Sequence, residues 1–172
     1  LFGINGSGMV DQLGIRDQVL CTVHTAGKAL GVSGAWVAGP SLLKEFLVNF
    51  SRGFVFSTAP SPIQFIMVRE AIAYLEQSSE RSKLVLSRAD YFRNEIKTQT
   101  AQSGAIVLGE NSPIIPIVLF DNDVVLKVFA ALKKLNINIA AIRPPTVKAG
   151  QARLRITINH SNCQNDLDNL LE

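Results

Sequence analysis

The segment Thr22-Val-His-Thr-Ala-Gly-Lys-Ala-Leu-Gly-Val-Ser-Gly-Ala-Trp-Val-Ala-Gly39 places one lysine, Lys28, between two apolar runs. Its glycines at 27, 31 and 34 allow the backbone to bend tightly and a flat ligand to approach closely. A lysine held in a crowded, dry place loses solvation of its ammonium group, which favours the neutral amine, a nucleophile towards carbonyls. The segment therefore predicts a reactive lysine in a turn between two short, buried strands.

Two other interpretations of this lysine can be weighed from the residues alone. A phosphate-binding P-loop requires a glycine five residues before Gly27 and a Ser or Thr after the lysine. This chain has Thr22 and Ala29 at those positions, so a P-loop is excluded. A Gly-Lys pair in an ordinary surface loop stays open as an alternative.

Composition limits the class of protein. Of the 172 residues, 47% are hydrophobic, which is enough for a folded core and argues against disorder. No apolar run reaches the roughly 18 residues that a membrane-spanning helix needs, so we expect no membrane partner. The net charge of +3 is small, and the basic residues are interspersed with acidic ones. We therefore expect no nucleic-acid partner, because such proteins usually show a clustered basic face.

The cysteines and the first residue bear on location and completeness. Cys21 and Cys163 lie near opposite ends of the chain and have neither metal-ligand nor disulfide spacing. We therefore expect no metal site and a cytoplasmic location, where thiols stay reduced. The chain begins with Leu1 in a loop-like segment punctuated by glycines. We interpret it as a fragment of a longer protein.

Hydrophobic periodicity predicts the order of the helices and strands. The expected helices cover about residues 40–50, 63–76, 80–98, 122–135 and 162–171, and the expected strands about 18–23, 32–38, 53–56, 105–108, 114–120, 137–142 and 152–158. Charged residues of the 80–98 helix are interpreted as a solvated face. Strands that alternate with helices indicate the α/β fold class, with an α/β or α+β layer in the C-terminal half. Ser78-Ser79 interrupts the helical pattern, which predicts two domains, 1–78 and 79–172.

Polar residues stand at one helix start and along one strand. Ser57, Thr58 or Ser61 is expected to cap the 63–76 helix. Arg153 and Arg155 are two positions apart in the 152–158 strand and therefore share a face. A guanidinium binds a carboxylate through two parallel hydrogen bonds, which suits an amino-acid substrate. A strand arginine held in a structural ion pair is the alternative.

Two segments resemble the α-oxoamine synthases, a family of pyridoxal-phosphate enzymes with the type I aminotransferase fold. Residues 25–34, Thr-Ala-Gly-Lys-Ala-Leu-Gly-Val-Ser-Gly, are similar to the lysine segment of this family. Residues 142–157, Ile-Arg-Pro-Pro-Thr-Val-Lys-Ala-Gly-Gln-Ala-Arg-Leu-Arg-Ile-Thr, are similar to the C-terminal signature of one branch. Lys148 departs from that signature, which usually has a proline there. The similarity extends along essentially the whole chain.

This resemblance implies a cofactor and the residues that bind it. Lys28 is expected to bond to the aldehyde of pyridoxal 5'-phosphate and later to move the substrate α-proton. Thr25 is expected to contact the cofactor, and a threonine that bonds its own backbone at a strand end is the alternative. Ser57 and Thr58 are expected to reach the cofactor phosphate of the neighbouring subunit in a homodimer.

The resemblance also implies how the chain divides and how substrate is held. Residues 1–78 correspond to the C-terminal part of the large cofactor-binding domain, and residues 79–172 to the small C-terminal domain. Arg155 is expected to clamp the substrate carboxylate. Arg143 and Thr146 are expected to border the substrate entrance, in a turn stiffened by prolines.

The implied activity is that of an acyltransferase in biotin synthesis, which condenses L-alanine with a pimeloyl thioester and releases carbon dioxide. Its partners are thus an amino acid and an acyl thioester. Other branches of the family, which use other amino acids or acyl groups, stay open, as does a non-catalytic relative or fragment that binds no cofactor. The family's aspartate that pairs with the pyridine nitrogen precedes the segment that begins this chain. We therefore expect the 172-residue piece to be inactive alone.

Overall fold

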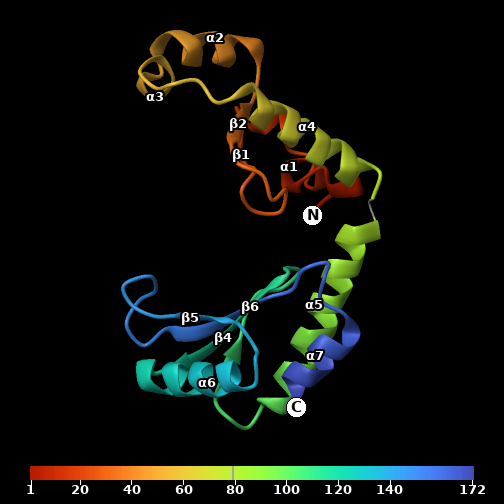
Figure 1. Ribbon diagram of the computed structural model, residues 1–172, viewed down its shortest axis with the longest axis vertical. Helices are drawn as coiled ribbons and strands as arrows, with labels where there is room; N and C mark the ends of the chain where they lie inside the picture. Colours follow the sequence, from red (N-terminus) through yellow and green to blue (C-terminus); the bar gives the residue numbers. More distant parts are fainter. Residues whose placement is uncertain (79) are drawn as a thin grey trace. The chain divides into compact units, whose positions relative to one another are not determined.

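The chain folds as two units, Leu1–Ser82 and Lys83–Glu172, and the computed structural model describes residues 1–78 and 80–172 (Figure 1). The helices and strands of the first unit are η1 Ile4–Gly6, α1 Met9–Gln12, η2 Arg16–Gln18, β1 Thr22–Thr25, β2 Ala35–Ala38, α2 Ser41–Phe50, α3 Arg52–Val55 and α4 Pro62–Glu76. Among the described residues, no helix combines the length and the hydrophobicity needed to cross a membrane.

A two-stranded hairpin lies at the centre of the first unit. β1 and β2 pair antiparallel, and His24 stacks on Trp36 across the strands with ring centroids 5.0 Å apart. The prediction of buried strands over about residues 18–23 and 32–38 is wrong, because each strand has only four residues and most of them are exposed. A hairpin has too few strands to build a buried layer by itself.

The helices of this unit follow the sequence prediction more closely. Proline stands immediately before α2, at Pro40, and at the first position of α4, at Pro62, where its fixed φ suits a helix start. The predicted strand over about residues 53–56 is wrong. Arg52–Val55 form the short helix α3, in which the amides of Phe54 and Val55 both donate to the carbonyl of Ser51 at 2.9 Å.

The first unit buries very little. Of its described residues, only Ala26 is fully buried. Large apolar side chains on and beside α2 and α3 are open to solvent, with Leu42 75%, Phe50 68% and Phe56 80% exposed. Burial of apolar surface is the main stabilising term in folding. The unit therefore lacks the core that would let it fold stably without additional surfaces to cover it.

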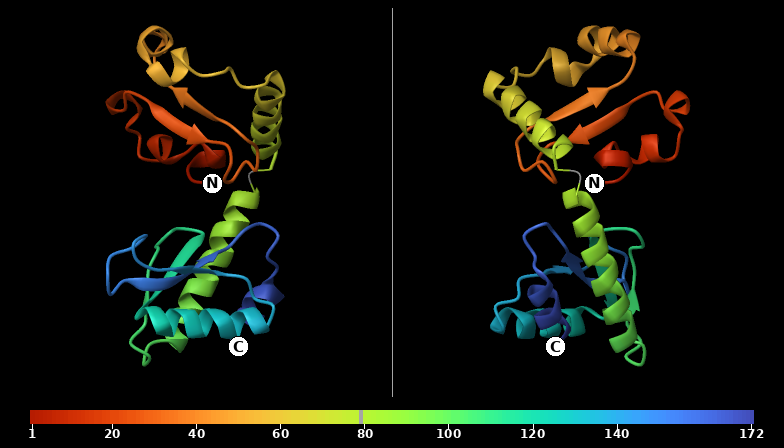
Figure 2. Two further views of the ribbon diagram at one scale, coloured as in Figure 1. Left: turned by 60° about the vertical axis from the view of Figure 1, so that its left-hand side comes forward. Right: turned by 90° about the vertical axis from the view of Figure 1, so that its right-hand side faces the viewer.

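The second unit is a two-layer structure of helices on a sheet (Figure 2). Its elements are α5, which begins at Glu80 and ends at Gln99, then β3 Ile106–Val107, β4 Ile114–Phe120, α6 Asn122–Lys134, β5 Ala140–Ile142, β6 Ala152–Thr157 and α7 Gln164–Leu171. The strands lie in the order β3-β4-β6-β5 and each pairs antiparallel with its neighbours. The expected helices are confirmed to within two residues, and the expected 137–142 strand is shorter, at three residues.

The core of this unit lies on one face of the sheet. Along β6, Ala152, Leu154 and Ile156 are buried while Arg155 and Thr157 are exposed, as the period of two in a strand requires. One cluster of core residues joins α5 and α7 to β4 and β6, and a second joins α6 to β6. All three helices therefore pack on the same face, and the opposite face carries the arginines.

One charge on α5 is buried. Arg93 is 4% exposed, and its guanidinium donates to the Asp90 carboxylate and to the carbonyl of Ser112. This pair of contacts ties α5 to the loop before β4. The interpretation of the charges on this helix as a solvated face is therefore wrong for Arg93, since the helix packs its Arg93 side against the sheet.

A reciprocal cap starts α7. The Asp166 carboxylate accepts a hydrogen bond from the Cys163 amide at 2.8 Å. This backbone hydrogen bond, with a second one from the Cys163 side chain, lowers the pKa of Asp166 below its usual 3.8. The charged carboxylate is therefore the form that holds the start of α7.

Phe92→Ala should destabilise the second unit by about 3–5 kcal/mol, because Phe92 is fully buried in the core between α5 and the sheet. Chemical denaturation followed by far-UV circular dichroism measures the change in free energy of unfolding. Lys97→Ala, on the exposed side of the same helix, is the control and should change it little. Equal effects of the two substitutions would contradict this account of the core.

The Asp166 cap of α7 also predicts that the stability of the folded protein depends on pH. The folded pKa of Asp166 lies below its unfolded value of 3.8, so its contribution is complete above that unfolded pKa and is lost as pH falls through the folded pKa. The wild-type advantage over Asp166→Asn should therefore be greatest above pH ~4 and shrink below it. Thermal unfolding of both proteins across this range measures it. Parallel pH profiles would show that the cap does not depend on this charge.

Candidate functional site

Lys28 lies in the turn that joins β1 to β2. The turn is closed by hydrogen bonds from the Ala26 amide to the Gly34 carbonyl (2.9 Å) and from the Val32 amide to the Ala26 carbonyl (3.1 Å). The Lys28 carbonyl accepts from the Gly31 amide at 3.0 Å. Gly31 and Gly34 have φ of 67° and 120°, a backbone conformation that other residues rarely adopt. The glycines thus shape the turn and fix the lysine backbone.

The side chain of Lys28 is exposed, so the expectation of a dry surrounding is wrong for this chain. Its neighbours Gly27 and Ala29 are small and also exposed, and they give it no cover. An exposed amine remains accessible to an aldehyde. Thr25 ends β1 opposite Ala35 and is likewise exposed, so the hairpin presents an amine and a hydroxyl near its tip.

Ser57 and Thr58 lie between α3 and α4, and both are exposed. The Ser57 hydroxyl donates to the Gly53 carbonyl at 2.5 Å, so its proton is already used at the end of α3. The residue at the cap position of α4 is Ser61, which makes no side-chain cap hydrogen bond. Capping by Ser57 or Thr58 is therefore wrong.

In the second unit, β6 carries Arg153 and Arg155 on the face opposite the core. Arg155 is exposed and stands opposite Pro116 of β4 and Ala140 of β5. Arg153 is half-buried, and Gln151 holds it from two sides. Its Nε donates to the Gln151 carbonyl and its Nη2 to the Gln151 side-chain oxygen, both at 2.9 Å. The two arginines share a face, but Gln151 holds the Arg153 side chain, whereas the Arg155 side chain is open to solvent.

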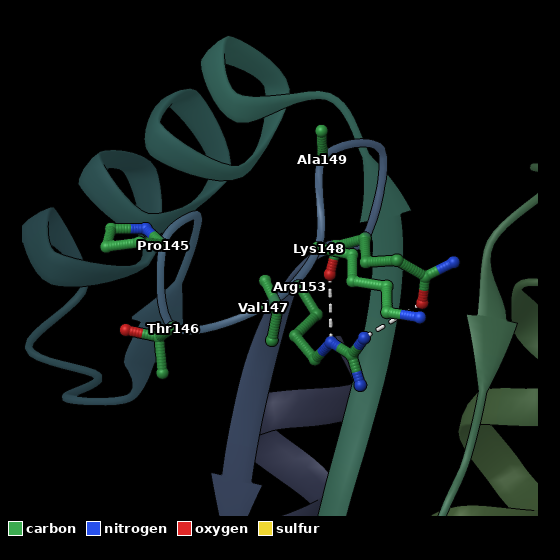
Figure 3. A pocket seen from close by; sticks show the side chains of 7 residues that line it. Pro145, Thr146, Val147, Lys148, Ala149 and Arg153 are labelled. Atoms are coloured by element: carbon green, nitrogen blue, oxygen red, sulfur yellow. Dashed lines mark hydrogen bonds between the residues drawn. The ribbon is translucent and has the colours of Figure 1, made fainter.

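The loop from β5 to β6 borders an open surface pocket of about 660 Å³ (Figure 3). Its lining residues are Pro145, Thr146, Val147, Lys148, Ala149, Gln151 and Arg153. Arg143 precedes the cavity, is exposed, and accepts from the Thr146 amide through its carbonyl at 3.0 Å. The structure thus brings Thr146 and Arg153 to one cavity, while Arg143 and Arg155 are not part of its lining.

Two features of this cavity were missed in the sequence. Gln151 and Lys148 were assigned no site role, yet Gln151 orients Arg153 and both line the cavity. The only signal available was a polar residue two positions before a strand arginine, which is common on exposed strands.

The side chains near the hairpin tip and before α4 can be compared with the groups that pyridoxal phosphate needs. Lys28 supplies an accessible amine for the aldehyde, and Thr25 and Thr58 supply exposed hydroxyls for hydrogen bonds to the cofactor. These groups fit the cofactor in chemistry. Across residues 1–78 and 80–172, no group of three or more His, Cys, Asp and Glu side chains is placed to hold a metal ion.

Comparison with known proteins identifies the family. A sequence model described as Aminotransferase class I and II matches residues 5–172. The chain belongs to this family. The expected fold class is thereby confirmed, as is the resemblance stated above to pyridoxal-phosphate enzymes of the aminotransferase type.

Two relatives with the same name illustrate the similarity within this family. The chain is 34% identical to 8-amino-7-oxononanoate synthase of Lysinibacillus sphaericus over 168 residues, which are 98% of this chain and 42% of that protein. It is 38% identical to 8-amino-7-oxononanoate synthase of Cupriavidus metallidurans over 175 residues, which are 100% of this chain and 43% of that protein. The chain thus spans less than half the length of these curated relatives.

Solved structures show the same aminotransferase-type fold. The crystal structure of 8-amino-7-oxononanoate synthase from Francisella tularensis matches with a TM-score of 0.85 at 24% identity, over 99% of this chain and 49% of that one. Serine palmitoyltransferase of Sphingomonas wittichii matches with a TM-score of 0.86 at 21% identity, over 99% and 42%. A structure of SPT with PLP internal aldimine matches at 0.87 and 23%, with the same coverage.

Proposed function

We propose that the intact protein catalyses the pyridoxal-phosphate-dependent, decarboxylative condensation of L-alanine with a pimeloyl thioester, as an 8-amino-7-oxononanoate synthase in biotin synthesis. The observation that carries this proposal is similarity over 98–100% of the chain to relatives of that name, at 34% and 38% identity. Two expected segments agree with it, the lysine turn at residues 25–34 and the arginine strand at residues 142–157.

The first unit is proposed to hold the cofactor, as the C-terminal part of a large cofactor-binding domain over residues 1–78. When bound, pyridoxal phosphate supplies an electron sink for the substrate carbanion. Lys28 would hold it covalently, and the substrate amine would displace Nζ from that bond. The freed Nζ amine would then move the proton at the substrate α-carbon. Thr25 would contact the cofactor, and Thr58 would donate to its phosphate. Ser57 would first have to release the Gly53 carbonyl to donate in the same way.

Residues 79–172 are proposed to form the small C-terminal domain, which binds the substrate. Arg155 is exposed on the open face of the sheet and has its guanidinium fork available for the two oxygens of a carboxylate. A carboxylate held there until it leaves as carbon dioxide suits a decarboxylative reaction. Arg143 and Thr146 border the route by which the substrate enters.

The assembly and location are part of the same proposal. The exposed apolar residues of α2 and α3 need covering surfaces, which supports a homodimer for the intact protein. Within it, Ser57 and Thr58 serve the neighbouring subunit's cofactor. We propose a cytoplasmic location, in keeping with two free cysteines. The 172-residue chain alone is proposed to be inactive, because Ala26 is the only fully buried residue among those described in its cofactor-binding unit.

A second candidate function has support from the fold. Serine palmitoyltransferase structures match as well as the oxononanoate enzyme does, with TM-scores of 0.86 and 0.85. Another α-oxoamine synthase, such as serine palmitoyltransferase, glycine C-acetyltransferase or 5-aminolevulinate synthase, is therefore the alternative. Turnover with alanine, serine or glycine distinguishes the oxononanoate enzyme from serine palmitoyltransferase and from the two glycine-using enzymes. A non-catalytic chain that binds no cofactor would form no adduct with pyridoxal phosphate at Lys28.

The cofactor site predicts selective labelling of Lys28. Titration of the chain with pyridoxal phosphate, borohydride reduction and peptide mapping should give an adduct at Lys28 in preference to the other lysines. The reason is that the glycine turn fixes its backbone and leaves its amine accessible. Lys28→Ala should lose this adduct, whereas Lys44→Ala, an exposed lysine on α2, should keep it. Labelling spread evenly over all lysines would overturn the assignment for this chain.

The carboxylate clamp predicts a selective effect on amino-acid binding. In the intact protein, Arg155→Gln should raise the KM for L-alanine about 30-fold or more, because a charge-assisted, two-pronged contact is lost. Steady-state kinetics with varied alanine and fixed thioester measure it. Lys127→Gln, on the exposed side of α6, removes the same charge elsewhere and should leave KM unchanged. An unchanged KM in Arg155→Gln would remove this residue from the site.

A further inference from the structure

One side-chain hydrogen bond joins the turn that carries Lys28 to a helix. The turn covers residues 26–34, and its two polar side chains are Lys28 and Ser33. Gln64 of α4 donates through Nε2 to the Ser33 hydroxyl at 3.2 Å, across 31 positions of the sequence. This contact, called here the Gln64–Ser33 tether, ties the turn to α4, which lies beside the hairpin (Figure 1).

The backbone of the turn is permissive by itself. Gly31 and Gly34 stand on either side of Ser33 and have positive φ, and glycine is the residue with the most conformational freedom. The hydrogen bond from the Ala26 amide to the Gly34 carbonyl closes the base of the turn, whereas residues 27–29 at its tip are exposed. The orientation of the turn therefore depends on contacts made by its side chains.

The other end of the tether is fixed by the start of α4. Gln64 lies in the first turn of this helix, where its own amide donates to the Ser61 carbonyl at 2.9 Å. Pro62, at the first helical position, restricts the backbone further. The Gln64 side chain is half-buried, which limits its rotamers. Because a helix holds a side chain more precisely than a loop does, the helix orients the turn.

We propose that Gln64 is a positioning residue, which holds the glycine turn through Ser33 in the orientation that presents the Lys28 amine. The reaction of this amine with the cofactor aldehyde rests on the proposed function, whereas the tether rests on the hydrogen bond. A turn that is ordered beforehand loses less entropy when its lysine is immobilised. Gln64 follows Thr58 by six residues, so the same helix start also anchors the segment proposed to meet a cofactor phosphate.

Loss of the tether should weaken adduct formation at Lys28. The full chain is titrated with pyridoxal phosphate, reduced with borohydride and mapped. Gln64→Ala should raise the half-saturating concentration for the Lys28 adduct about two- to tenfold, the range for one hydrogen bond. Ser33→Ala should have the same effect, and the double variant should add nothing, because both substitutions remove one bond. Gln77→Ala, at the exposed far end of α4, is the control and should change nothing.

Amide hydrogen exchange without cofactor separates positioning from a general effect on stability. In Gln64→Ala the amides of Gly31 and Val32, which close the turn, should exchange faster by a similar factor, while those of β4 stay unchanged. Gln64→Glu should restore slow exchange, because the Ser33 hydroxyl can donate to the new carboxylate. Circular dichroism of each variant verifies that the fold is retained.

Different results overturn the tether and the proposed function. If Gln64→Ala speeds exchange only within α4 and leaves the Lys28 adduct unchanged, Gln64 merely stabilises its own helix and the inference is wrong. Additive losses in the double variant would show that Gln64 and Ser33 act through separate contacts, and would also overturn it. Absence of a Lys28 adduct in the wild-type chain would contradict the proposed function, whereas faster turn exchange in Gln64→Ala would still support the tether.

Discussion

The alternation of side chains along β6 governs the second unit. β6 lies between β4 and β5, so it cannot shift by one residue without turning Ala152, Leu154 and Ile156 away from the helices. Burial of those residues against α5, α6 and α7 therefore sets the register of the sheet. The same constraint directs Arg153 and Arg155 to the opposite, open face. The alternation of side chains along β6 therefore determines both the burial of the core residues and the placement of the two arginines.

The first unit is organised in the opposite way. Its hairpin is defined locally, by glycine turns and by cross-strand pairs such as His24 with Trp36, and hardly at all by burial. Backbone hydrogen bonds within a two-stranded ribbon contribute little net stability by themselves. Large apolar side chains on and beside α2 and α3 are exposed in the described part of the unit. Lys28 is exposed as well, even though its sequence surroundings are typical of an enclosed lysine.

Much of the secondary structure could be predicted from periodicity and from proline positions. The helices α2, α4, α5, α6 and α7 were expected within about two residues, because each has an apolar stripe or a clear start. The 53–56 segment was not, since Phe54, Val55 and Phe56 have high strand propensity and the helical turn depends on the Ser51 carbonyl. Burial of Arg93 was missed because its partner, the carbonyl of Ser112, is 19 residues away. Such contacts leave no local trace in a sequence.

The candidate site shows the same division between local and long-range information. Residue types and spacing were sufficient to place Lys28 in a turn and two arginines on one face, because both follow from local geometry. They could not distinguish Arg153 from Arg155, which differ in burial and in the hydrogen bonds that Arg153 donates to Gln151. Positions two apart on a strand are separated by about 7 Å, enough for two anions to bind without sharing an arginine. Gln151 orients one arginine, whereas the other is open to solvent.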